Sequence, residues 1–126
     1  MISCKNLTFS YSSQKHFSFP DISCADREAL LILGQSGKGK TTLLHLMALL
    51  LRPKNGEIII NGKDIAPLSA AEAAAVRAGQ IGIVYQRPHF VSSLSVMENV
   101  LLPNYLAQKP QDKNHARQLA EQLGFA

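Results

Sequence analysis

Alternating apolar and polar residues predict strands at the start of the chain. Residues 2–11 alternate and place Leu7, Phe9 and Tyr11 on one side, which is typical of a half-buried strand. Residues 16–19 and 22–24 look like one further strand that is interrupted at Pro20, whose missing N–H suits an edge or a bend. The first part of the chain therefore predicts an antiparallel β layer.

Two other runs, residues 29–33 and 81–85, are apolar without alternation. Such runs are typical of strands that are buried on both faces, as in a parallel sheet covered by helices. A short strand over residues 57–60 is followed by Asn61-Gly62, a pair that favours a tight hairpin turn. We expect the chain to return through residues 63–65.

The first two predicted helices differ in character. Residues 41–51 are apolar on all sides, so we expect this helix inside the domain. The next helix begins after Ser69, with Glu72 three residues later in a capping-box pattern. This alanine-rich helix is predicted to end at Gly79, because glycine adopts the conformation that closes a helix.

Two more helices are predicted in the last third of the chain. One covers residues 95–102 and is stopped by Pro103, since proline lacks the N–H that continues a helix. The other covers residues 112–123, has one apolar stripe, and ends at Gly124.

The sequence GQSGKGKT, between the apolar run 29–33 and the first helix, has the spacing G-x-x-x-x-G-K-T. Glycines allow backbone N–H groups to turn toward phosphate oxygens, and the positive end of the helix strengthens the attraction. Lys40 can reach the β- and γ-phosphates, and the Thr41 hydroxyl can bind Mg²⁺. The strand–loop–helix context favours a phosphate-binding loop over a Gly/Lys-rich surface turn.

A second polar group follows the other apolar run. Gln86 ends residues 81–85, and ligands of open α/β sheets bind beyond the carboxyl ends of the strands. If the two runs are neighbouring strands, the Gln86 amide falls near the terminal phosphate and its metal. The alternative, a polar residue that merely closes a strand, fits the spacing equally well.

Size, charge and cysteine content narrow the class of protein. The chain has 126 residues, the scale of a single domain, and a net charge of +4 without a block of like charge. Its 8 aromatic residues do not alternate with basic ones, so we expect no nucleic-acid partner. Cys4 and Cys24 are expected to be free thiols. With no targeting segment and no run of ~20 apolar residues, the cytoplasm is the expected location.

Several motifs together resemble the ATP-binding domain of ABC-type ATPases. The resemblance runs along the whole chain, and residues 95–103 are similar to the lipoprotein-release and macrolide-export branch. The motifs are the phosphate loop at residues 34–44, the hairpin Asn61-Gly62 with Asp64-Ile65, the Q-loop Ile83-Val84-Tyr85-Gln86, the helical-subdomain start Glu98-Asn99-Val100, and the aromatic Tyr11.

The resemblance implies a fold and a division of the chain. The fold is α/β: a P-loop NTPase core, with a partly parallel sheet and flanking helices, plus the N-terminal antiparallel β layer. Residues 1–86 would form the ATP-binding core, and residues 87–126 the Q-loop and the start of the helical subdomain.

The resemblance also implies roles for single residues. Tyr11 would stack on adenine, although it could instead be a core aromatic that continues the Leu7 and Phe9 stripe. Thr41 and Gln86 would bind Mg²⁺. Lys38 departs from the family pattern, in which small residues are commoner, and its side chain could lie in solvent. The implied ATP-binding residues are Tyr11, Gly34, Ser36, Gly37, Lys38, Gly39, Lys40, Thr41, Thr42 and Gln86.

The expected partners follow from the family. They are ATP with Mg²⁺, a transmembrane permease subunit that docks at the Q-loop region, and a second ATP-binding domain. The protein would be peripheral on the inner face of the cell membrane and would power transport.

Motifs that hydrolysis requires in this family are missing from the sequence. None of the 9 acidic residues directly follows a run of four apolar residues, so no Walker B pair is present. An LSGGQ-type signature and a switch histidine are also missing. We interpret the chain as about the first half of an ABC ATPase domain, truncated before the signature motif. Without these groups we expect ATP binding without hydrolysis, and no catalytic residue is assigned.

Two other functional classes remain as alternatives. A soluble ABC-type ATPase that acts on nucleic acid or ribosomes usually carries long insertions or tandem domains, which the compact spacing here does not match. A different P-loop NTPase, such as a GTPase, should contain an Asn-Lys-x-Asp guanine-binding motif, and a small-molecule kinase is a further possibility. The Asn-x-x-Asp that is present, residues 61–64, falls in the predicted hairpin.

Overall fold

The computed structural model describes residues 1–125, which form two compact units. The first unit is Met1–Ala74, and the second begins at Ala75. The division falls within helix α2 (Ala70–Gln80). The sequence predicts a division by function, into residues 1–86 and 87–126, whereas the two units are defined by compactness. The functional division stays a prediction.

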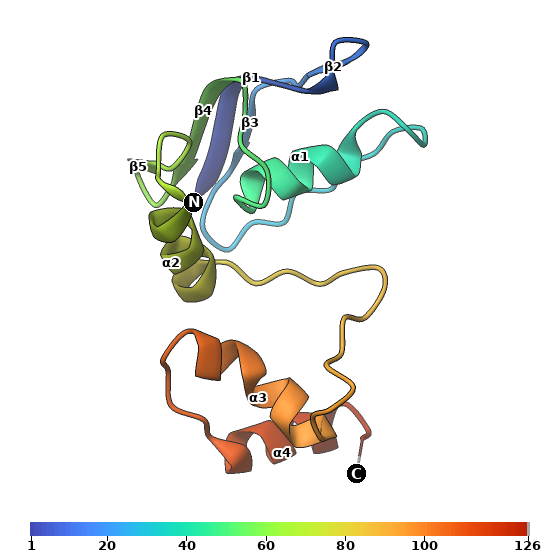
Figure 1. The fold of residues 1–126 in the computed structure, drawn as a ribbon, viewed down its shortest axis with the longest axis vertical. Helices are drawn as coiled ribbons and strands as arrows, with labels where there is room; N and C mark the ends of the chain where they lie inside the picture. Colours follow the sequence, from blue (N-terminus) through green and yellow to red (C-terminus); the bar gives the residue numbers. More distant parts are fainter. Residues whose placement is uncertain (126) are drawn as a thin grey trace. The chain divides into compact units, whose positions relative to one another are not determined.

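A five-stranded antiparallel sheet forms the first unit, with the long strand β1 at its centre (Figure 1). The order along the sheet is β2-β1-β4-β5, and β3 also pairs with β1. The predicted antiparallel layer is therefore present. Its strands are β1 (Ile2–Ser12), β2 (Lys15–Ser18), β3 (Ile22–Cys24), β4 (Asn55–Ile60) and β5 (Lys63–Asp64).

Strands β2 and β3 follow one another along β1, as the sequence predicts for one interrupted strand. The first pairs Thr8 with Ser18, and the second pairs Ile2 with Cys24. Between them, the Phe19 N–H donates to the Leu7 carbonyl (3.0 Å). Pro20 has no N–H to offer, and it stands at the break.

The core of the first unit combines residues from the sheet, α1 and the loop after β5. Large side chains that are almost completely buried are Leu7, Leu46, Ile58, Ile65 and Cys4. Burying each aliphatic side chain contributes roughly 1.5–3 kcal/mol to the stability of the fold. Burial also raises the pKa of the Cys4 thiol, so it stays neutral. Both cysteines are free, as expected.

A bulge in β1 is matched by a glycine in β4. The pairing register shifts between Lys5 and Thr8, and Asn6 has a φ of 50°. Opposite lies Gly56, with a φ of 101°; a Cβ there would lie 2.6 Å from the carbonyl oxygens of Lys5 and Asn6. Because both the space and the backbone conformation exclude a side chain, glycine is required at this position.

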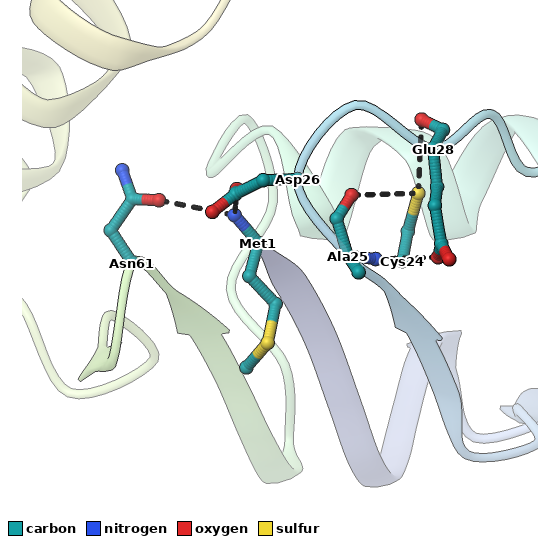
Figure 2. Close-up of polar contacts among 6 residues, drawn as sticks. All are labelled: Met1, Cys24, Ala25, Asp26, Glu28 and Asn61. Carbon is teal, nitrogen blue, oxygen red and sulfur yellow. Dashed lines mark hydrogen bonds and ion pairs between the residues drawn. The ribbon is translucent and has the colours of Figure 1, made fainter.

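The predicted hairpin turn between β4 and β5 is confirmed. Asn61 and Gly62 have φ values of 50° and 80°, as a tight turn with two left-handed residues requires. The Asn61 N–H donates to the Met1 carbonyl (3.0 Å). Figure 2 shows the amino group of Met1 between the Asp26 carboxylate and the Asn61 side-chain oxygen, to both of which it donates.

The segment after β3 is closed by its own hydrogen bonds. The Ala25 N–H donates to the Glu28 carboxylate (3.0 Å), and the Cys24 thiol donates to the Glu28 carbonyl (3.5 Å) (Figure 2). These bonds fix the turn from which the chain runs toward the phosphate loop.

The two predicted parallel strands are not formed in the described residues. Residues 29–33 and 81–85 belong to no strand, and Leu31, Leu33 and Val84 are 78%, 81% and 100% exposed. A strand exists only when a neighbour accepts and donates its backbone hydrogen bonds. Within residues 1–125 neither run has such a neighbour, so an apolar pattern alone does not make it a strand.

Helix α1 (Lys40–Met47) is shorter and less enclosed than predicted. It ends because Leu49 adopts a φ of 58°, and the Leu50 N–H then donates back to the His45 carbonyl (2.8 Å). Leu44 is 56% exposed, so the prediction that the helix is buried on all sides was wrong. Figure 1 shows α1 alongside the sheet.

Helix α2 begins at the predicted capping box but continues past Gly79 to Gln80. Gly79 is not among the glycines with positive φ, so it does not close the helix. Glycine permits the left-handed conformation that ends a helix but does not impose it.

The second unit contains α3 (Val96–Leu106) and α4 (Lys113–Gln122), which pack against each other (Figure 1). Pro103 lies inside α3, contrary to the prediction that it stops the helix. Its fixed φ is compatible with a helix, and the Ala107 N–H donates to the Pro103 carbonyl (3.0 Å), which continues the turn. Each helix within residues 1–125 is too short or too polar to cross a bilayer.

The capping boxes at the starts of α2 and α3 are expected to make these helices sensitive to acid. The Glu72 carboxylate accepts from Ser69, and that of Glu98 accepts from Ser95; these side-chain and backbone hydrogen bonds lower the pKa of each carboxyl. Because the folded-state pKa is lowered, each ionised carboxylate stabilises its helix above the ordinary glutamate pKa of 4.5. This stabilisation is lost as the pH falls through the folded-state pKa. Helical circular dichroism should therefore fall in acid.

Acid titration of variants shows how much of this loss of helical signal comes from the two capping-box glutamates. Replacing Glu72 and Glu98 together by glutamine should flatten the acid transition, because glutamine does not titrate. The matched control is Glu121→Gln in α4. An acid transition that is the same in wild type and in the double variant would contradict this assignment.

Candidate functional site

The loop of residues 34–39 leads into α1 through two left-handed glycines. Gly37 has a φ of 78°, and Gly39 has a φ of 90° and is the N-cap of the helix. No side chain caps this N-terminus. Its backbone N–H groups and the positive end of the helix dipole therefore face the exposed loop, which is the arrangement that attracts an anion.

Lys40 is the first residue of α1, and its side chain reaches back to the start of this loop. Its ammonium donates to the carbonyl oxygens of Gly34 (2.6 Å) and Gln35 (2.8 Å). The first turn of α1 contains no acidic residue. A positive charge, a helix N-terminus and glycine-rich backbone thus meet without a neutralising carboxylate on that turn.

The remaining predicted loop residues occupy distinct positions. Ser36 and Lys38 are exposed, and the Lys38 N–H donates to the Gln35 carbonyl (3.4 Å). Thr41 is exposed on the first turn of α1, whereas Thr42 is buried. Thr41 therefore presents its hydroxyl where a ligand could reach it, next to Lys40.

Tyr11 is joined to α1 by a hydrogen bond. Its hydroxyl lies 3.2 Å from the Thr42 hydroxyl, and its ring meets the Phe9 ring edge-on at a centroid distance of 4.7 Å. The side chain is nevertheless 55% exposed. Tyr11 is therefore not a core aromatic, and its exposed ring is attached to the helix that follows the phosphate loop. Stacking on adenine stays a prediction.

Sequence reasoning missed Phe17, whose ring lies against Gly39. A Cβ on Gly39 would lie 2.7 Å from Cδ1 of Phe17, closer than real Cβ atoms approach. The sequence signal was a single apolar residue between polar neighbours in residues 15–18, and the pairing of β2 with β1 places Phe17 opposite Phe9. The pattern shows which face Phe17 occupies but cannot show that the phosphate loop packs on it.

Gln86 belongs to the second unit, so its relation to the phosphate loop stays a prediction. It is exposed and follows residues 81–85 in a loop where the Tyr85 and His89 rings meet edge-on at 5.0 Å. Of the predicted ATP-binding residues, the first unit brings together Tyr11 and those from Gly34 to Thr42.

The residues present fit a magnesium ion that arrives with a nucleotide. Among the described residues, no three His, Cys, Asp or Glu side chains gather as a metal site. Magnesium bound with ATP takes most of its ligands from phosphate oxygens and water and needs few from the protein. The exposed Thr41 hydroxyl beside the loop suits that role.

Comparisons with known proteins agree with this geometry. The family model for the ABC transporter matches residues 18–126. The lipoprotein-releasing system ATP-binding protein LolD of Wigglesworthia glossinidia brevipalpis is 34% identical over 98% of this chain and 55% of its own length. The macrolide export ATP-binding/permease protein MacB of Sodalis glossinidius is 37% identical over 79% of this chain and 16% of its own.

A solved structure has the same fold. The ATP-binding cassette MJ0796, in a post-hydrolysis state bound to ADP and Pi, superposes with a TM-score of 0.82 and 27% identity, over 97% of this chain and 55% of that one. The predicted α/β fold class is confirmed by this similarity. The chain spans about half the length of LolD and of this cassette. The chain belongs to the ABC transporter family of ATP-binding proteins.

Proposed function

We propose that this chain binds MgATP and forms the nucleotide-holding part of the ATP-binding subunit of an ABC transporter. The observation that carries the proposal is the Lys40 ammonium, held 2.6 Å and 2.8 Å from two loop carbonyls at the N-terminus of α1. The left-handed glycines Gly37 and Gly39 shape the loop around it.

Each predicted residue has a physical task in binding. Lys40 would exchange the Gly34 and Gln35 carbonyls for β- and γ-phosphate oxygens, which are stronger acceptors because they are charged. Backbone N–H groups of the loop would hold the remaining phosphate oxygens. The Thr41 hydroxyl would bind Mg²⁺, and the exposed Tyr11 ring would stack on adenine.

The partners proposed for the whole protein rest on its relatives. LolD is named an ATP-binding protein of a lipoprotein-releasing system, and MacB an ATP-binding/permease protein. We propose a membrane permease docked near Gln86, a second ATP-binding domain, and a position on the cytoplasmic face of the membrane. These names favour a transporter over a soluble ABC-type ATPase or another P-loop class.

A nucleotide competition experiment tests the proposal. A fluorescent ATP analogue bound to the chain should be displaced by MgATP at concentrations no higher than those needed with MgGTP, because no guanine-binding motif is present in the sequence. A preference for GTP of about tenfold or more, which corresponds to ~1.4 kcal/mol, would contradict it.

We further predict that the 126-residue chain does not turn ATP over. Phosphoryl transfer depends on positioning groups, and the sequence has neither the Walker B carboxylates nor the signature motif. Phosphate release from MgATP should be the same with wild type as with Lys40→Ala. Turnover that the Lys40→Ala substitution abolishes would show the prediction to be wrong.

A further inference from the structure

Aromatic side chains form a continuous row beside the phosphate loop. Tyr11 meets Phe17 edge-on at 6.2 Å between centroids, and Phe17 stacks on Phe19 at 6.0 Å with 8° between the ring planes. Phe9 lies opposite Phe17 in the pairing of β1 and β2, and it contacts Tyr11 as well. We call these four residues the aromatic row; Phe17 is its central member.

The aromatic row touches the phosphate loop at Gly39. A Cβ added there would lie 2.7 Å from Cδ1 and 2.9 Å from Cε1 of Phe17, and 3.2 Å from Cε1 of Phe19. The rings therefore occupy the side of Gly39 on which a side chain would project. Gly39 is also the left-handed N-cap of α1, so this contact supports the residue at which the loop becomes a helix.

The aromatic row touches α1 a second time at Thr42. The Tyr11 hydroxyl lies 3.2 Å from the Thr42 hydroxyl, and Thr42 is only 6% exposed. Gly39 and Thr42 flank Lys40 and Thr41, which are the proposed ligands of phosphate and magnesium. The row thus contacts α1 at the residue before and the residue after Lys40 and Thr41, on one face of the helix.

We propose that Phe17 is a positioning residue for the nucleotide. Its ring holds Gly39 and the Tyr11 ring in one arrangement, and so joins the phosphate loop to the base-stacking platform. This inference rests on the proposed function, that the loop binds MgATP. The physical gain is preorganisation: a glycine-rich loop that is already held loses less conformational freedom when phosphate binds.

Magnesium tripolyphosphate separates this role from a role in base stacking alone. The probe has the phosphates of ATP but no base. Phe17→Ala should weaken binding of both MgATP and magnesium tripolyphosphate by about tenfold, since the loop is no longer held. Tyr11→Ala should weaken MgATP binding and leave tripolyphosphate binding nearly unchanged. Unchanged tripolyphosphate affinity in Phe17→Ala would overturn the inference.

Two further variants control for general loss of structure. His16→Ala changes the neighbouring residue in β2, which is exposed and points to the opposite face of the strand, and it should leave both affinities unchanged. Phe17→Leu fills only part of the space beside Gly39 and lacks the ring that contacts Tyr11, so it should weaken tripolyphosphate binding by a smaller factor than Phe17→Ala, about threefold. If Phe17→Ala does not fold, a loss of tripolyphosphate affinity in folded Phe17→Leu supports the inference, and wild-type affinity overturns it.

A measurement without ligand makes the two proposals distinguishable. Amide hydrogen exchange in residues 34–41 should be faster in Phe17→Ala than in wild type, while His16→Ala exchanges like wild type. Unchanged exchange in the loop would overturn the positioning role. A wild-type chain that binds neither MgATP nor tripolyphosphate would instead refute the proposed function, whatever the exchange result.

Discussion

Replacing Lys40 with alanine is expected to weaken MgATP binding by at least ~30-fold. The variant removes a positive charge that the structure holds within the loop through the Gly34 and Gln35 carbonyls. Truncating one partner of a close charged pair costs about 2–5 kcal/mol, and each ~1.4 kcal/mol is a factor of ten in affinity. Equilibrium dialysis with labelled ATP measures the effect.

A matched charge control accompanies this variant. Lys63→Ala removes the same charge from the exposed start of β5, outside the phosphate loop, and should lower the affinity less than about threefold, through long-range attraction alone. Equal losses in Lys40→Ala and Lys63→Ala would mean that general positive charge, rather than the loop, holds the nucleotide.

The Gly56→Ala substitution should have the largest effect on stability. The added Cβ would stand 2.6 Å from the carbonyl oxygens of Lys5 and Asn6, and the residue would keep a φ of 101° that only glycine adopts easily. Strain of this kind costs about 1–3 kcal/mol by itself, and the clash is with backbone that cannot rotate away. We expect a loss of roughly 3 kcal/mol or more, or no folded sheet.

Urea denaturation compares this variant with a second glycine variant. Gly62→Ala also has a positive φ, 80°, but a Cβ there meets nothing within 4 Å. Its cost should therefore be the conformational strain alone, about 1 kcal/mol. If Gly56→Ala were no more destabilising than Gly62→Ala, the pairing of β4 against the β1 bulge would be incorrect.

Features fixed by neighbouring residues were predicted well from the sequence. The Asn61-Gly62 turn and the Ser69–Glu72 capping box depend on a few adjacent positions, and both are present. The loop motif likewise places its glycines where left-handed backbone is needed at Gly37 and Gly39. In each case the chemistry of the residue selects the local conformation directly.

Features that depend on distant partners were predicted less well. Residues 29–33 have the composition of a buried strand, but a strand needs hydrogen-bonding neighbours, and none pairs with them in the described chain. Pro103 was expected to end α3, yet packing against α4 accompanies a helix that continues past it. Local preference is a weak guide where tertiary contacts decide.

The residues of the candidate site also fall into those that a local motif identifies and those that depend on distant contacts. The sequence motif points directly to Lys40 and Thr41, because a short linear motif places them. The contact between Phe17 and Gly39 joins residues 22 positions apart, and only the packing of the phosphate loop against the sheet brings them together. Gln86 belongs to the second unit, so its role beside the phosphate loop stays a prediction.

The central claim, that residues 34–42 bind MgATP, is tested most directly by mapping amide chemical shifts during a titration. Adding MgATP should shift the amide signals of the loop and of Tyr11, with saturation at one nucleotide per chain. Magnesium tripolyphosphate should shift the loop signals but not that of Tyr11. Shifts confined to other parts of the chain, or no shifts at millimolar MgATP, would contradict the account.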